Sequence, residues 1–354
     1  MNSQKVKRLK AEERWIHLKK SFGSMEDFGF SIIIPVKKIN DYLRESIPEI
    51  LHLEYDDFEL IILPNQLPNP MPKFLLHPKI RVIASGSVSP AIKRDLGGKN
   101  SRFSFLAFLD DDAFPKKDWL KVADSLFKTS EVAAIGGPAM TPESDSISQQ
   151  ASGLFFETVI GGGGLDYRYK PAQRSFYVDD FPTVNFIIRK SVFFSIGGFD
   201  SHYWPGEDTK LCRDLIRAGH RIWYCRDLQV YHHRRHLWLP HLKQVGNYGK
   251  HRGYFAKKFP ENSRKWLYFV PSIFLLGNLI LCVGSLFTSH LFFFWLWALA
   301  FYFSIAAIDV FLRTRNILLG SMVIPTVFLS HLVYGFHFMR GLFSHDRSFR
   351  SYLR

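Results

Sequence analysis

The stretch FSFLAFLDDDAFP, residues 103–115, decides how the chain folds. It begins with a nearly continuous apolar run, and three carboxylates, Asp110, Asp111 and Asp112, follow directly. An apolar run of this length is typical of a strand buried on both faces of a parallel sheet. The three aspartates then fall at the carboxyl edge of the sheet, which is where ligands bind in open α/β folds.

Other apolar runs support the same fold. They lie at 30–36, 58–65 and 80–85. Helix-like stretches at 41–53 and 116–128 follow the first of these runs and the aspartates. Strands that alternate with helices predict an α/β fold with a Rossmann-like, mostly parallel sheet and flanking helices. We expect this domain to cover residues 30–265, after a basic N-terminal extension at 1–29.

Three long apolar segments near the end of the chain predict attachment to a membrane. Residues 266–287 and 317–339 contain no charged side chain, and 291–312 contains only Asp309. Each segment reaches the roughly 20 residues that span a bilayer as a helix. We therefore expect two or three membrane segments within 266–340, followed by a basic tail at 341–354.

The distribution of basic residues constrains how these segments are arranged. Residues 231–265 hold nine Lys or Arg against one Glu, which is typical of the cytoplasmic side of a membrane protein. If all three segments crossed the membrane, Arg313 and Arg315 would lie on one side and the arginines of the tail on the other. Both groups of arginines favour the cytoplasmic side. Either the third segment, interrupted at Pro325, is re-entrant or interfacial, or the stronger first segments override the charge of the tail. Two crossings and a third segment that does not cross are the preferred interpretation.

Composition limits the partners and the cellular compartment that are expected for this protein. The formal net charge of +14 suggests an anionic partner, but no nucleic-acid-binding module is recognisable and none is expected. The three cysteines show no metal-binding or disulfide spacing, which fits a reducing compartment. The first twenty residues contain no apolar secretory signal. We expect a protein of the cell membrane whose α/β domain is cytoplasmic.

The aspartates of the opening stretch raise a question of charge repulsion. In a strand that ends at Asp110, alternation sends Asp110 and Asp112 to one side and Asp111 to the other. Two converging carboxylates can hold a divalent cation, which removes the repulsion and can bind a diphosphate. The alternative is a solvated turn in which an aspartate caps the next helix.

A second acidic pair lies far from the first in sequence. Glu207 and Asp208 follow a glycine and precede an amphipathic stretch with apolar residues at helical spacing. Acidic residues stabilise the first turn of a helix, which accounts for one carboxylate more readily than for two. The pair is therefore a candidate catalytic group.

Four segments together carry a resemblance to a known family. They are SIIIPVK (31–37), FLDDDAFPKKDW (108–119), GGFD (197–200) and GEDTKLCRDLIRAGHRIWYCRDLQVYHHRR (206–235). In this order the chain resembles a family-two inverting glycosyltransferase of the GT-A fold over residues 30–260, in the membrane-attached branch that builds surface polysaccharides or lipid-linked glycans. The resemblance implies a GT-A domain followed by C-terminal membrane helices.

The resemblance implies roles for individual residues. Asp110 and Asp112 would bind Mg²⁺ or Mn²⁺, and His232 would be a further metal ligand, with His233 as the competing choice. Asp208 would be the general base, with Glu207 beside it in the catalytic group. The donor would contact residues from several segments: Pro35, Val36, Asn65, Lys93, Arg94, Asp110, Asp111, Arg234 and Arg235. Asn65 replaces a carboxylate that is common in the family, and Asp95 stands where Asn is common.

The implied function is transfer of a sugar from a UDP-, GDP- or dTDP-sugar to a lipid-linked or glycan acceptor, at a hydroxyl or phosphate. Processive synthases of this family usually carry a QxxRW motif, and this chain has QVGNY at 244–248. That difference favours non-processive transfer. Two alternatives remain: an inactive scaffold of a membrane glycan-assembly complex, and a sugar nucleotidyltransferase. A nucleotidyltransferase would need a glycine-rich loop after the first strand, and PVKKINDY (35–42) contains no glycine.

Overall fold

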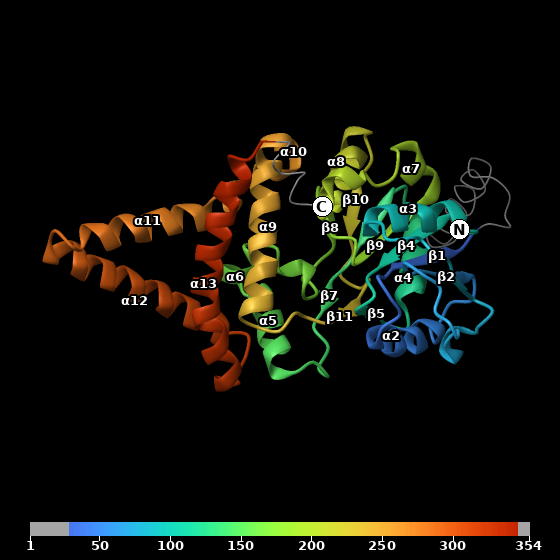
Figure 1. Ribbon diagram of the computed structural model, residues 1–354, viewed down its shortest axis with the longest axis horizontal. Coiled ribbons are helices and arrows are strands. Elements are labelled where there is room, and N and C mark those ends of the chain that lie inside the picture. Colours follow the sequence, from blue (N-terminus) through green and yellow to red (C-terminus); the bar gives the residue numbers. More distant parts are fainter. Residues whose placement is uncertain (1–27, 346–354) are drawn as a thin grey trace, which may run out of the picture. The chain divides into compact units, whose positions relative to one another are not determined.

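The computed structural model describes residues 28–345, which form two compact units (Figure 1). The first, here called the sheet unit, comprises the residues up to Gly137 together with Arg174–Val230. The second, the helical unit, comprises Pro138–Gln173 and the residues from Tyr231 on. Nearly all of the expected N-terminal extension and most of the expected basic tail lie outside the described residues.

The sheet unit is built on one eight-stranded sheet with the order β3-β2-β1-β4-β9-β6-β10-β8. Its strands are β1 (Phe30–Pro35), β2 (Phe58–Leu63), β3 (Ile80–Val82), β4 (Phe105–Leu109), β6 (Ala134–Gly136), β8 (Phe176–Val178), β9 (Asn185–Arg189) and β10 (Ile222–Tyr224). Only β8 and β9 run against their neighbours. The expected mostly parallel sheet is confirmed. The short strands β5 (Ala113–Pro115), β7 (Ala139–Met140) and β11 (Val230–His232) are not part of it.

Helices flank this sheet on both faces, which explains its apolar strands. Every residue of β1, β2, β4 and β9 is buried. On one face, Gly98 of α3 (Pro90–Asn100) lies against Leu106, and α7 (Lys190–Ser195) places Phe193 beside Phe108. On the other face, Phe127 of α4 (Trp119–Thr129) stacks on Phe105 with ring centroids 4.3 Å apart. The remaining long helices of this unit are α2 (Asp41–Leu51) and α8 (Glu207–Arg217).

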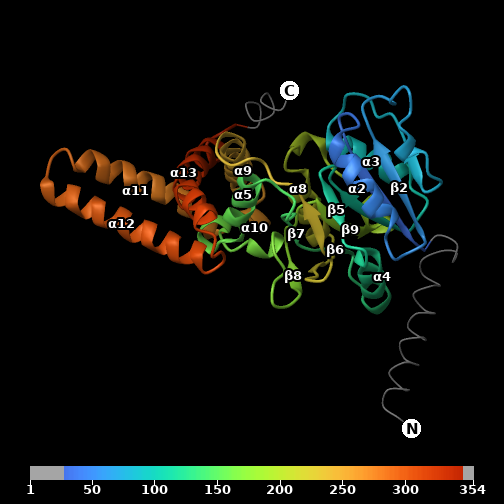
Figure 2. The same cartoon turned by 90° about the horizontal axis from the view of Figure 1, so that it is seen from below.

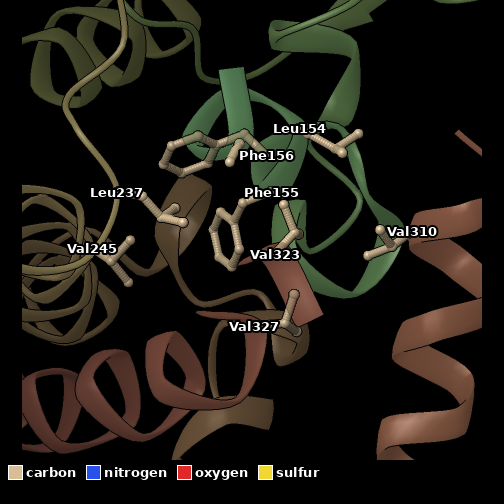
Figure 3. Packing of buried hydrophobic residues seen from close by; sticks show 9 residues of the cluster. Leu154, Phe155, Phe156, Leu237, Val245, Val310, Val323 and Val327 are labelled. Carbon is tan, nitrogen blue, oxygen red and sulfur yellow. The ribbon is translucent and has the colours of Figure 1, made fainter. Parts of the chain in front are cut away.

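The helical unit is made almost entirely of helices. They are α5 (Ile147–Glu157), α6 (Val159–Gly162), α9 (Leu239–Lys258), α10 (Pro260–Ser263), α11 (Val270–Gly284), α12 (Ser289–Phe311) and α13 (Ile317–Leu342). Figure 3 shows the core in which side chains of α5, α9, α12 and α13 gather together with Leu237. Phe155 and Phe156 are central to this cluster, with Val310, Val323 and Val327 from the apolar helices around them. The apolar segments therefore share a core with helices that precede them in sequence.

Within residues 28–345, three helices are long and apolar enough to cross a membrane: Trp266–Gly284, Ser289–Phe311 and Ile317–Leu342. The first includes a short 3₁₀ turn ahead of α11. The expectation that Pro325 interrupts the third segment is wrong, because α13 runs unbroken through it. Proline removes one backbone hydrogen bond of a helix, but Val323 and Val327 on either side of it are buried in the core of the helical unit.

Close contact between α9 and α13 depends on glycine. A Cβ atom on Gly253 of α9 would lie 2.0 Å from the carbonyl oxygen of Phe338, and one on Gly341 of α13 would lie 1.9 Å from that of Lys250. Both distances are far below van der Waals contact with a rigid backbone atom. The two helix backbones can approach this closely only because small residues lie between them, as in other tightly packed helix pairs.

Gly253→Ala is therefore expected to destabilise the helical unit, because the added methyl group forces α9 away from α13. Overpacking of this kind costs about 1–3 kcal/mol. The matched control is Gly277→Ala on α11, where a Cβ would meet no atom within 4 Å, and which should be neutral or slightly stabilising through helix propensity. Thermal unfolding in detergent measures both. Equal unfolding temperatures for the two variants would contradict the close packing.

Candidate active site

The three aspartates lie in a turn directly after β4. β4 ends at Leu109, and the backbone N–H of Ala113 donates to the carbonyl of Asp110 over 3.2 Å. The premise that the strand includes Asp110 is wrong, because the chain turns one residue earlier. The expected pairing is nevertheless present, since carboxylate oxygens of Asp110 and Asp112 lie within 4.8 Å of each other. Two such oxygens fit the hard-ligand preference of Mg²⁺ or Mn²⁺.

Asp111 turns away from this pair. Its Oδ2 accepts a hydrogen bond of 2.5 Å from Nδ2 of Asn40, whose own Oδ1 caps α2 by accepting from the N–H of Leu43. Burial raises the pKa of the Asp111 carboxyl to about 6, and the neighbouring Asp112 carboxylate adds to the rise. Asp111 thus lies apart from Asp110 and Asp112, as strand alternation predicts, and its bond to Asn40 ties the turn to the start of α2, a contact that the sequence did not indicate.

Arg94 brings the two acidic motifs together. From α3, its Nη2 donates to Oδ1 of Asp110 and its Nη1 donates to Oε1 of Glu207, each over 2.8 Å. The side chains of Arg94 and Glu207 are only 6% and 7% exposed, whereas that of Asp110 is 31% exposed. One buried guanidinium thus joins carboxylates that are nearly a hundred residues apart in sequence, at the carboxyl edge of the sheet.

Glu207 and Asp208 form the first turn of α8, where the helix dipole favours negative charge. Burial raises the pKa of the Glu207 carboxyl to about 7, the Arg94 guanidinium opposes the rise, and Asp208 adds to it. Asp208 is less buried than Glu207, and its Oδ1 accepts from the N–H of Thr209 over 2.7 Å. Charge on Glu207 at neutral pH therefore depends on Arg94, and Asp208 is the more accessible of the two carboxylates.

Lys93, next to Arg94, donates hydrogen bonds to groups at the ends of β1 and β2. Its Nζ donates to the carbonyl oxygens of Val36 and Leu63 over 2.6 and 3.2 Å and to Oδ1 of Asn65 over 2.5 Å. These acceptors follow β1 and β2, so Pro35, Val36 and Asn65 lie at the same edge of the sheet. Burial lowers the pKa of the ammonium group. Contact of these residues with a nucleotide stays a prediction.

Lys93→Met is expected to destabilise the sheet unit by about 1–3 kcal/mol, because buried acceptors at the ends of β1 and β2 lose their donor. Lys99→Met, at an exposed position on the same helix, is the control and should leave stability nearly unchanged. Thermal unfolding compares the two. If Lys93→Met unfolds like the control but binds nucleotide more weakly, Lys93 serves the ligand rather than the strands.

Asp95 follows Lys93 and Arg94, and each of these three consecutive residues contacts a different part of the sheet unit. Its Oδ1 accepts from the backbone N–H of Phe199 over 2.9 Å, which anchors the GGFD segment to α3. Burial raises the pKa of the Asp95 carboxyl to about 6. In the sequence, Asp95 stands out only because it occupies a position where Asn is common in the family. Phe199, which bonds to Asp95, and Asp111, which bonds to Asn40, both lie far away in sequence from their partners, so no local pattern could have identified these contacts.

The remaining predicted residues belong to the helical unit. His233 is buried, and its Nδ1 lies 2.5 Å from Oδ1 of Asp145, while Oδ2 of Asp145 accepts from the N–H of Arg234 over 3.1 Å. The guanidinium of Arg234 bonds to Oγ1 of Thr141 and to the carbonyl oxygen of Ala139, and one of its nitrogens lies 3.1 Å from Nδ1 of His232. His232 is only partly buried and Arg235 is exposed. His232 is thus the more accessible of the two histidines.

Two known proteins with similar sequences match different shares of this chain. A pre-mycofactocin glycosyltransferase of Mycobacterium tuberculosis is 28% identical over 177 residues, which are 50% of this chain but only 37% of that protein. A dolichyl N-acetyl-alpha-D-glucosaminyl phosphate 3-beta-D-2,3-diacetamido-2,3-dideoxy-beta-D-glucuronosyltransferase of Methanococcus voltae is 21% identical over 334 residues, 90% of this chain and 99% of that one. The chain therefore spans well under half of the mycobacterial relative and nearly all of the archaeal one.

A solved structure supports the fold. The mannosyltransferase PcManGT from Pyrobaculum calidifontis, in complex with GDP-Man and Mn²⁺, is 14% identical, with a TM-score of 0.56 over 92% of each chain. The mixed α/β sheet with flanking helices is typical of the GT-A fold, as the sequence predicted. In addition, the family model described as glycosyltransferase like family 2 matches residues 28–245. Since this match covers more than half of the chain and includes both acidic motifs, the protein belongs to glycosyltransferase family 2.

Proposed function

We propose that the protein is an inverting glycosyltransferase that transfers a sugar from a nucleotide-diphosphate sugar to a hydroxyl or phosphate of a lipid-linked acceptor, without processivity, at the cytoplasmic face of a membrane. One observation carries this proposal: the Asp110–Asp112 turn and the Glu207–Asp208 helix start meet through Arg94 at the carboxyl edge of the sheet. The proposed reaction needs one acidic group that binds a divalent cation and another that accepts a proton from the acceptor.

Asp208 is proposed as the general base. In an inverting transfer the acceptor hydroxyl attacks the anomeric carbon from one face, and the nucleoside diphosphate leaves from the other. The C–O bond to the acceptor forms as the glycosidic bond to phosphate breaks, and the carboxylate takes the hydroxyl proton. Its place in the first turn of α8 stabilises the charged form of the base. Glu207, held by Arg94, positions this helix start.

Asp110 and Asp112 would hold the divalent cation. When bound, Mg²⁺ or Mn²⁺ supplies positive charge to the departing diphosphate. We propose His232 as the third ligand in preference to His233, because His232 is partly exposed whereas His233 is buried. The PcManGT complex contains Mn²⁺, which supports a cation of this kind. Arg234 and Arg235 are proposed to act near the donor, with Arg235 the exposed one of the pair.

The acceptor and the membrane location are the finer parts of the proposal. The name of the archaeal relative specifies a dolichyl-linked sugar phosphate, and the three long apolar helices would keep the active site near such lipids. The basic segment 231–265 supports the cytoplasmic orientation. The QVGNY sequence at 244–248 supports addition of one sugar, or few, per encounter.

Release of free nucleoside diphosphate tests the proposed reaction. Purified protein is incubated with UDP-, GDP- and dTDP-sugars, a membrane lipid extract and Mn²⁺. We expect release from at least one donor, which falls to background on chelation and returns when Mn²⁺ or Mg²⁺ is added back. Pyrophosphate as the product would indicate nucleotidyl transfer, and donor binding without turnover would indicate a scaffold. Either result would contradict the proposal.

A further inference from the structure

The three long apolar helices have different surroundings within the helical unit. Of the apolar windows, 11% of Trp266–Gly284 and 6% of Ser289–Phe311 is buried against the rest of the protein, compared with 28% of Ile317–Leu342. Figures 1 and 2 show α11 and α12 running side by side away from α13, whereas α13 lies alongside α9. We call α11, α12 and their connection the apolar hairpin. Within residues 28–345, the two arms of this hairpin therefore have the least protein cover of the three apolar helices.

The base of the apolar hairpin rests across α13. At the start of α11, Oγ of Ser272 donates to the carbonyl oxygen of Gly335 over 3.1 Å. At the end of α12, Val310 packs in the same core as Val323. The two arms thus contact α13 along the stretch between Val323 and Gly335, where Phe274 of α11 and Tyr302 of α12 both pack against His331. Beyond these contacts both arms run away from α13. A hairpin directed into a bilayer therefore leaves α13 lying in the plane of the membrane surface.

The partner of α13 is a basic helix. Nε2 of His241 lies 3.2 Å from Oγ of Ser330, and the Nζ of Lys257 bonds to the carbonyl oxygen of Ser344, so α9 accompanies the whole second half of α13 in parallel. Along this stretch α9 carries five cations: Lys243, Lys250, Arg252, Lys257 and Lys258. Charged residues are strongly disfavoured in the hydrocarbon core of a bilayer. If α13 crossed the membrane, α9 and its cations would have to enter with it.

Charge along the apolar hairpin follows the same pattern. Arg264 and Lys265 precede it, and Arg313 and Arg315 follow it. Its tip, residues 285–288, contains no charge, and Leu286 and Phe287 there are 81% and 79% exposed. Basic residues gather where a chain remains on the cytoplasmic side. Both ends of the hairpin therefore belong on one side of the membrane.

The last turn of α12 is also held in a polar setting. Asp309 pairs with Arg313, and its Oδ2 accepts from the backbone N–H of Ile160 in α6 over 2.9 Å. The side chain of Arg313 in turn donates to the carbonyl oxygen of Glu157 over 2.7 Å. These contacts place the base of the hairpin, α6 and the end of α5 in one polar layer. Such a layer suits the headgroup region rather than the bilayer interior.

We infer that only the apolar hairpin enters the bilayer, and that α13 lies in the membrane interface beside α9, so that the chain returns to the side of α9 after α13. The second arm, α12, has 23 residues and is about 35 Å long as a helix. The first arm, α11, has 15 residues and is about 22 Å long, and the 3₁₀ turn ahead of it extends the apolar span to the 19 residues Trp266–Gly284. These lengths are close to a hydrocarbon core of roughly 30 Å. The cations of α9 then face anionic lipid headgroups. This inference rests on the proposed membrane location and adds the topology of the chain.

Cysteine labelling on the full chain tests the topology. Cys282, the exposed native cysteine, is replaced by Ser, and single cysteines are introduced as Asn247→Cys on α9 and His345→Cys after α13, both at exposed positions. Cells with intact membranes and sealed inverted vesicles are treated with a membrane-impermeant maleimide. We expect both variants to be labelled to the same extent in inverted vesicles and neither in intact cells, with equal labelling of both after detergent.

Labelling of the two positions from opposite sides of the membrane would overturn the inference, because α13 would then cross. Labelling of both positions in the soluble fraction would overturn it as well, because no part of the chain would be membrane-bound. Sugar transfer by each variant is measured separately with nucleotide sugar and Mn²⁺. Loss of transfer in the parent chain counts against the proposed function, whereas the labelling pattern reports only the topology.

Discussion

Asp208→Asn is expected to lower kcat for sugar transfer by about 10²–10⁴-fold, which is the usual contribution of a positioned general base. The amide keeps the size of the side chain and can still accept from the N–H of Thr209, as the carboxylate oxygen does at 2.7 Å, but it cannot take the acceptor proton. KM for the donor should change little, because Asp208 is not proposed to hold the nucleotide. Steady-state kinetics with a saturating donor measure the effect.

Asp214→Asn is the matched control for this variant. Asp214 lies on the same helix and pairs with Lys210 and Arg213, so its replacement removes a carboxylate from α8 without touching the proposed site. It should retain transfer, with a stability loss of about 1 kcal/mol or less. Equal activity of Asp208→Asn and Asp214→Asn would exclude Asp208 as the base.

Arg94→Met is expected to produce the largest loss of stability in the sheet unit. Removing one partner of a buried ion pair costs about 3–5 kcal/mol, because the other charge is left uncompensated. Glu207 accounts for most of this loss, since its side chain is 7% exposed and that of Asp110 is 31% exposed. An effect of this size corresponds to a fall of roughly 10 °C in the unfolding temperature of a domain of this length.

A second substitution shows whether charge is the cause. Glu207→Gln in the Arg94→Met background removes the stranded carboxylate, so the double variant should unfold at a higher temperature than Arg94→Met alone. Thermal unfolding of the wild type, both single variants and the double variant measures the coupling between the two side chains. Additive effects would mean that Arg94 does not stabilise Glu207 through its charge.

Much of the sheet unit could be predicted because its signals are local. Continuous apolar runs identified the strands at 30–36 and 58–65, and the observed β1 and β2 end within two residues of these bounds. The acidic motifs could be identified as candidate groups in the same way. Strand ends were harder to predict: β4 stops at Leu109 rather than at Asp110, and the turn that follows is stabilised by Asn40, far away in sequence.

Properties that depend on distant partners could not be predicted from local patterns. Arg94 was expected to line a nucleotide pocket, and its bridge between two acidic motifs depends on how α3, β4 and α8 pack together. Pro325 suggested a break, but the packing around α13 outweighs the one hydrogen bond that proline removes. Gly246, Gly249 and Gly253 of α9 lie at helical spacing, but the sequence alone does not show that α13 is the helix against which they pack.

The central claim is that Asp110 and Asp112 form a cation site that is separate in role from the base Asp208. Electron paramagnetic resonance of Mn²⁺, titrated into the purified protein with a nucleoside diphosphate, tests it directly. We predict one tightly bound Mn²⁺ per chain in the wild type and in Asp208→Asn, and loss of that binding in Asp112→Asn. Undiminished Mn²⁺ binding in Asp112→Asn would contradict the account.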